Sequence, residues 1–100
     1  MLACDFVTVE TIALTRIYVL FFVSLDRRRV EFVATTKNPD GRWVAQQARN
    51  LMMQLGEGDR RFKFLIRDRD SKFSFDFDAV FRSESIRIVR TVASDGTLRR

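Results

Sequence analysis

Two aspartates stand at positions where an apolar strand favours other side chains. Asp5 lies inside the apolar stretch LACDFVTVE, and Asp68 follows the stretch RFKFLI with only Arg67 between them. A charged side chain is costly to bury in a strand unless it is paired or binds a metal. Mg²⁺ and Mn²⁺ prefer oxygen ligands, so Asp5 and Asp68 together would suit either ion. Asp68 taken singly is more simply explained as a turn residue or a helix cap.

The residue types that the sequence lacks narrow the possible chemistry. The chain contains no histidine, which excludes Ser–His and Cys–His nucleophilic sites as well as histidine metal ligands. Cys4 is the only cysteine, which excludes an intramolecular disulfide and a zinc site built from several cysteines. Carboxylates are therefore the expected carriers of any catalysis.

The composition is typical of one globular domain. Of 100 residues, 46% are hydrophobic and 31% are charged, and ten phenylalanines favour a core rich in strands. The net charge of +5 favours a polyanionic partner, either nucleic acid or an acidic membrane surface. The apolar run IYVLFFVSL has nine residues and lies inside the chain, whereas a membrane-spanning helix needs ~20. We therefore expect a cytoplasmic protein with no membrane partner.

Hydrophobic periodicity predicts an α/β fold with the element order β-β-β-α-β-α-β. The first three strands should form an antiparallel meander, and the two later strands should be added in parallel by helical crossovers. Asn38 or Asp40 should cap the first helix, and Trp43 should anchor that helix to the sheet. The predicted strands cover residues 2–9, 16–25, 30–36, 61–66 and 86–92, and the predicted helices cover 42–55 and 74–84.

The predicted strand at 30–36 should present alternate side chains to opposite faces of the sheet. One face would carry Val30, Phe32 and Ala34, and the other Glu31, Val33 and Thr35.

The predicted topology allows the two aspartates to meet. The first and fourth strands can be parallel neighbours at the centre of the sheet, and open α/β sheets carry their sites at the carboxyl ends of such strands. Asp5 and Asp68 would then form a carboxylate pair at one edge of the sheet. Around this pair, Arg67, Arg69 and Lys72 could contact phosphates, as could Lys37 and Arg42 near the first helix. For any single one of these basic residues, a solvated surface charge is the simpler explanation.

Two segments carry a resemblance to a known family. The stretches ACDFVTVET and LIRDRDSKF, with WVAQQARNL between them, resemble the catalytic core of the retroviral-integrase and insertion-sequence transposase superfamily. The resemblance covers roughly residues 2–91, and NPDGRWVAQQARNL and FDAVFRSESIRIVRT resemble a bacterial branch of that family. It implies an α/β fold of the ribonuclease H-like type, with a mixed sheet that is incomplete at the C-terminus. Asp5 matches the first catalytic aspartate of the family and Asp68 the second.

The resemblance further implies two-metal phosphoryl transfer on DNA, with Mg²⁺ or Mn²⁺ as cofactor. Asp5 would bridge both ions and Asp68 would hold one. The family's third ligand is a glutamate on a later helix, and the sequence reads as a core truncated before it. Glu84 precedes the fifth strand, and it is more simply explained as a cap or a solvent-exposed residue at the end of the second helix than as this third ligand. We therefore expect residues 1–92 to be a partial integrase-type core and residues 93–100 an irregular tail.

Three expectations follow from this partial core. Metal binding should be weak, the chain should be inactive alone, and one face of the sheet should leave apolar surface uncovered. The expected partner is DNA, with self-association or binding to a full-length transposase as further partners. The alternatives are a non-catalytic nucleic-acid-binding or protein-interaction module, and a decayed fragment without function.

Overall fold

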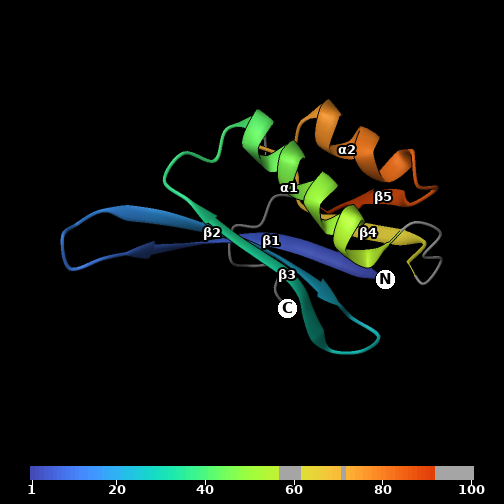
Figure 1. Ribbon diagram of the computed structural model, residues 1–100, viewed down its shortest axis with the longest axis horizontal. Helices are drawn as coiled ribbons and strands as arrows, with labels where there is room; N and C mark the ends of the chain where they lie inside the picture. Colours follow the sequence, from blue (N-terminus) through green and yellow to red (C-terminus); the bar gives the residue numbers. More distant parts are fainter. Residues whose placement is uncertain (57–61, 71, 92–100) are drawn as a thin grey trace.

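The described part of the chain folds into a mixed sheet of five strands with two helices packed on it (Figure 1). The computed structural model describes residues 1–56, 62–70 and 72–91. Within these residues the predicted element order is confirmed, and the predicted tail at 93–100 lies outside them. The elements are β1 (Leu2–Glu10), β2 (Arg16–Ser24), β3 (Arg29–Thr36), α1 (Gly41–Leu55), β4 (Phe64–Arg67), α2 (Phe75–Arg82) and β5 (Arg87–Arg90).

The strand order β3-β2-β1-β4-β5 places β1 at the centre of the sheet. β1 and β3 each pair antiparallel with β2, which confirms the predicted meander. β4 pairs parallel with β1 on one side and with β5 on the other, which confirms the predicted parallel neighbours. The paired residues of β1 and β4 are Leu2 with Leu65 and Ala3 with Ile66.

Both helices begin at a side-chain cap. The Asp40 carboxylate accepts a hydrogen bond of 2.8 Å from the Trp43 amide, which confirms Asp40 as the cap of α1. The Ser74 hydroxyl accepts one of 3.3 Å from the Phe77 amide at the start of α2. α1 ends at Gly56, whose positive φ of 93° suits a residue without a Cβ.

The core lies between the two helices and one face of the sheet (Figure 1). Phenylalanine rings fill its centre, and the rings of Phe77 and Phe81 on α2 lie 5.1 Å apart and both pack near Phe22 on β2. Trp43 is partly buried against this core, as predicted. The other fully buried apolar side chains are Leu2, Leu20, Val44, Ala48, Leu51 and Leu65.

A β-bulge in β3 corrects the predicted alternation of that strand. Phe32 pairs with Phe22, but Val30 pairs with Val23, so Glu31 is an extra residue opposite β2. Because neighbouring residues on β2 point to opposite faces, Val30 and Phe32 lie on opposite faces and not on one shared face. The Glu31 side chain is 3% exposed, and one carboxylate oxygen lies 3.4 Å from Nε of Arg29. Alternation along one strand could not reveal this shift, because a bulge depends on the pairing with β2.

The face of the sheet that points away from α1 and α2 carries apolar side chains. On β1, Leu2 and Cys4 are buried towards the helices, so Val7 and Val9 point to the other face, where each is 47% exposed. Val33 on β3 is 53% exposed on the same face. Both helices lie on the opposite side of the sheet (Figure 1), so the predicted uncovered apolar surface is confirmed for the described residues. No helix among these residues is both long and apolar enough to cross a membrane.

The burial of α2 generates a prediction about stability. Phe77→Ala should lower the free energy of unfolding by about 3–5 kcal/mol, because Phe77 is fully buried among other rings. Phe75→Ala changes the same residue type on the same helix, where Phe75 is 75% exposed, and should shift stability by at most about 0.5 kcal/mol. Urea denaturation of both variants measures the difference. Equal losses in the two variants would contradict the position of α2 on the sheet.

Candidate metal centre

The pairing of β1 with β4 brings the two predicted aspartates to neighbouring positions. Asp5 stands two residues after Ala3, and Asp68 stands two residues after Ile66, the partner of Ala3. In a parallel pair, equal steps along both strands keep residues level and on the same side. Continued two residues past the last pair of the ladder, this register sets Asp5 opposite Asp68, which directly follows β4. This is the edge of the sheet where the sequence predicted a carboxylate pair.

Local hydrogen bonds orient both carboxylates. Asp5 is exposed, and its Oδ1 accepts a hydrogen bond of 2.8 Å from the Phe6 amide. Asp68 is half-buried, and its Oδ1 accepts one of 3.0 Å from the Asp70 amide, which closes a turn. Asp68 thus closes a turn, as the simpler explanation predicted. It also directly follows β4, where the sequence predicted a metal ligand.

The buried thiol of Cys4 reports the charges around this edge. Burial raises the pKa of the Cys4 thiol well above its usual value. The Arg67 charge lowers that pKa, whereas the carboxylates of Asp5, Asp68 and Asp78 raise it. Three carboxylates from β1, from the segment after β4 and from α2 therefore act on one thiol. Cys4 and Asp78 were not predicted as parts of this region.

The described residues supply two carboxylates of the expected ligand set and no third one. Among them, no group of three His, Cys, Asp or Glu side chains is placed to hold a metal ion. Glu84 is exposed in the turn after α2, where its amide donates to the Phe81 carbonyl. The two aspartates offer hard oxygen donors, which fit Mg²⁺ or Mn²⁺ better than softer metals. The donor chemistry fits, and the small number of carboxylates favours weak binding.

Arg67 is bound inside the fold. Its side chain is 5% exposed, and Nε and Nη2 donate hydrogen bonds of 2.8 and 2.7 Å to the two carboxylate oxygens of Asp78. Nη1 donates one of 2.6 Å to the Asp68 carbonyl. A contact of Arg67 with phosphate, as predicted, would require this side chain to leave Asp78. The sequence held a signal, because Arg67 follows buried Leu65 by two positions and so faces the helices.

Lys72 is tied to its own loop and to the sheet. Its ammonium lies 2.9 Å from a carboxylate oxygen of Asp70, and 5.3 and 5.8 Å from the ring centres of Phe6 and Tyr18. Partial burial raises the pKa of Asp70, whereas hydrogen bonds from the side chain and the amide of Lys72 lower it by a larger amount. The pKa of Asp70 is therefore lowered overall. Lys72, the second predicted phosphate contact, is thus already engaged by Asp70 and by two aromatic rings.

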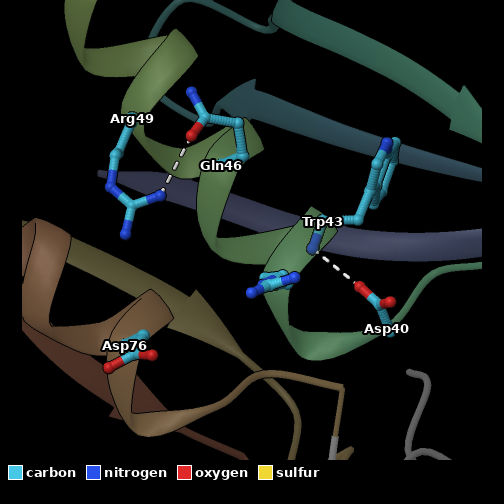
Figure 2. A pocket seen from close by; sticks show the side chains of 6 residues that line it. Asp40, Trp43, Gln46, Arg49 and Asp76 are labelled. Atoms are coloured by element: carbon cyan, nitrogen blue, oxygen red, sulfur yellow. Dashed lines mark hydrogen bonds between the residues drawn. The ribbon is translucent and has the colours of Figure 1, made fainter.

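The remaining predicted phosphate contacts, Arg69, Lys37 and Arg42, are exposed. Arg42 lines an open hollow of about 610 Å³ between α1 and the start of α2 (Figure 2). Two arginines and two aspartates line this hollow, so its charge favours neither an anionic nor a cationic ligand. Neither Asp5 nor Asp68 lines it. Its lining residues are Asp40, Arg42, Trp43, Gln46, Arg49 and Asp76.

The convergence of charges on Cys4 can be tested by titrating its thiol. Its ¹³Cβ chemical shift should give a midpoint above about 8.5, the usual cysteine pKa. Because the unfolded chain then loses the thiol proton at lower pH than the folded chain, stability should fall as the pH rises through that value. Asp5→Asn and Asp68→Asn should each lower the midpoint, because each removes a negative charge near the thiol.

Glu10→Gln is the matched control for this titration, because Glu10 lies on β1 and does not act on the thiol. An unchanged midpoint in both aspartate variants would show that the two carboxylates do not lie near Cys4.

Comparisons with known proteins bear on the fold of this chain. A chain in the cryo-electron microscopy structure of the simian T-cell lymphotropic virus intasome, in complex with PP2A regulatory subunit B56 gamma, is similar with a TM-score of 0.76. The match covers 96% of this protein at 15% sequence identity, and this protein spans 35% of the length of that chain. No protein-family model and no curated protein matches the sequence. The likeness shows that this protein shares the mixed α/β fold of part of that chain.

Proposed function

We propose that the described residues form part of the catalytic core of a DNA transposase or integrase with a ribonuclease H-like fold. The observation that supports this proposal is the parallel pairing of β1 with β4, whose register, continued by two residues, would set Asp5 opposite Asp68. The structural likeness to a chain of a retroviral intasome supports it independently of the two aspartates. The motifs ACDFVTVET and LIRDRDSKF place the same two residues at the family's first two catalytic positions.

In this proposal Asp5 and Asp68 hold Mg²⁺ or Mn²⁺ at the carboxyl end of β4. The bound ions would activate a water or a DNA 3′-hydroxyl and stabilise the leaving oxygen. Asp5 reaches this position from the middle of a long central strand, whereas Asp68 reaches it from a turn closed by the Asp70 amide. With two such carboxylates among the described residues, metal binding would be weak, and we expect no cutting of DNA by these residues alone.

The proposed DNA contacts are the three of the five predicted basic residues that the fold leaves exposed. Arg69 directly follows Asp68, and Lys37 follows the end of β3. Arg42 extends the set to the first turn of α1. Arg67 and Lys72 serve the fold instead, because each is already bound to a carboxylate. Phosphate contacts from the exposed set would fix the DNA next to the two aspartates.

Metal binding should stabilise the folded protein through Asp5. At an Mn²⁺ concentration ten times the dissociation constant, binding adds about 1.4 kcal/mol, which thermal denaturation detects. Asp5→Asn should abolish this gain, whereas Asp76→Asn on α2 should retain it. Single-turnover assays should show no nicking or joining of DNA by this chain alone. Robust activity that Asp5→Asn abolishes would overturn the expectation of inactivity, and equal stabilisation of all three proteins would overturn the metal site.

A non-catalytic DNA-binding module is the second candidate, favoured by the exposed basic residues and the net charge of +5. Both candidates predict binding through phosphates. Affinity falls as the salt concentration rises, and in Arg69→Ala the plot of log affinity against log salt concentration should become less steep by about 0.9. Arg16→Ala is the control, since Arg16 is the exposed first residue of β2 and is paired with Glu10. Fluorescence anisotropy with a duplex measures both. Binding that is unaffected by Mn²⁺ and by Asp5→Asn favours the module over the catalytic core.

A further inference from the structure

We propose that Asp78 on α2 is a positioning residue that acts through Arg67 to fix the backbone of Asp68. The inference rests on the proposed function, in which Asp68 holds a metal ion. It assigns a role to a buried ion pair that the ligand set itself does not use. Asp78 would not touch metal or DNA, and its effect would pass through the guanidinium of Arg67.

The contacts of the guanidinium carry this inference. The two oxygens of Asp78 accept from Nε and Nη2 of Arg67 at 2.8 and 2.7 Å, which is a bidentate pair. The guanidinium is planar and rigid, so the direction of the remaining nitrogen, Nη1, is fixed once the other two are held. Nη1 donates to the Asp68 carbonyl at 2.6 Å. The position of Asp78 therefore determines where the Asp68 peptide can lie.

The surroundings make this connection stiff. Arg67 and Asp78 are each 5% exposed, and the Phe73 ring centre lies 5.4 Å from the guanidinium carbon. Exclusion of water strengthens charged hydrogen bonds and makes an unpaired partner costly. On the other side, the Arg67 carbonyl accepts a hydrogen bond of 2.8 Å from the Thr91 amide after β5. The peptide before Asp68 and the peptide after it are thus each held by a hydrogen bond.

The helix that carries Asp78 is itself firmly placed. Asp78 lies directly after Phe77 and three residues before Phe81, and both of these rings are fully buried in the core. Asp78 consequently lies on the buried side of α2, where a carboxylate is unusual unless it has a partner. Arg67 is that partner. The chain Asp78, Arg67, Asp68 links the core to the candidate metal centre through side chains that have little freedom to move.

The test must separate positioning from stability. Asp78→Asn keeps the shape but leaves the buried guanidinium without its counter-charge, so this variant loses stability and can fail to fold. The double variant Arg67→Met/Asp78→Leu removes both charges and keeps the volume apolar, an exchange that proteins often tolerate. It retains the core and loses the hydrogen bond to the Asp68 carbonyl.

Two measurements on the double variant decide the inference. The dissociation constant for Mn²⁺, followed by the electron paramagnetic resonance signal of free Mn²⁺, should rise at least about tenfold, as for other groups that orient ligands. Hydrogen exchange of the Asp70 amide should become faster, because that amide donates to the Asp68 carboxylate. Leu51→Ala, at a fully buried position on α1, is the control for lost stability, and under conditions where it is folded its Mn²⁺ affinity should equal that of the wild type.

The outcomes distinguish this inference from the proposed function. Wild-type Mn²⁺ affinity and wild-type exchange at Asp70 in a folded double variant would overturn the positioning role. If the wild type binds no Mn²⁺, the proposed metal site fails, and the exchange at Asp70 alone decides whether Asp78 fixes the Asp68 backbone. A loss of affinity in Leu51→Ala equal to that in the double variant would show a general effect of stability and would also overturn the positioning role.

Discussion

The short parallel ladder between β1 and β4 is the constraint on which the rest of the structure depends. It joins the antiparallel meander to the two parallel strands, and two residue pairs define its register. Sixty-three positions separate Ala3 from its partner Ile66, so this contact closes most of the chain into one sheet. A shift by one residue would turn every side chain of β4 to the other face. Leu65 would leave the core, and Asp68 would no longer lie level with Asp5.

Much of this arrangement could be predicted from periodicity, and the failures have physical reasons. Apolar runs and turn residues suffice for the elements, and the antiparallel meander follows from its short connections. The crossover from β3 through α1 to β4 passes over two strands, so short connections do not explain it. The bulge at Glu31 was missed because it arises between two strands and leaves no mark on the alternation of one. The pair of Arg67 with Asp78 was missed because a charged strand end suggests solvent. Only the alternation from Leu65 shows that Arg67 points inwards.

The internal use of basic residues changes the meaning of the net charge. Of the five basic residues predicted to contact phosphate, Arg67 and Lys72 are held by carboxylates in the fold. Their charges are largely compensated where they lie, so they contribute little field at the surface. Arg69, Lys37 and Arg42 remain exposed, on three different segments of the chain. A DNA interface on this protein would therefore be built from separated contacts and not from one continuous basic patch.

The bulge in β3 has a consequence for how copies of this protein can meet. β3 is an edge strand, and an edge with regular unpaired amides and carbonyls is a template for another strand. Here the extra residue Glu31 interrupts the regular spacing, and its buried carboxylate would have to lie beside any added strand. The apolar side chains stand on the flat face of the sheet instead. Growth by adding strands is hindered, whereas stacking of two faces ends with the second copy and closes a finite assembly.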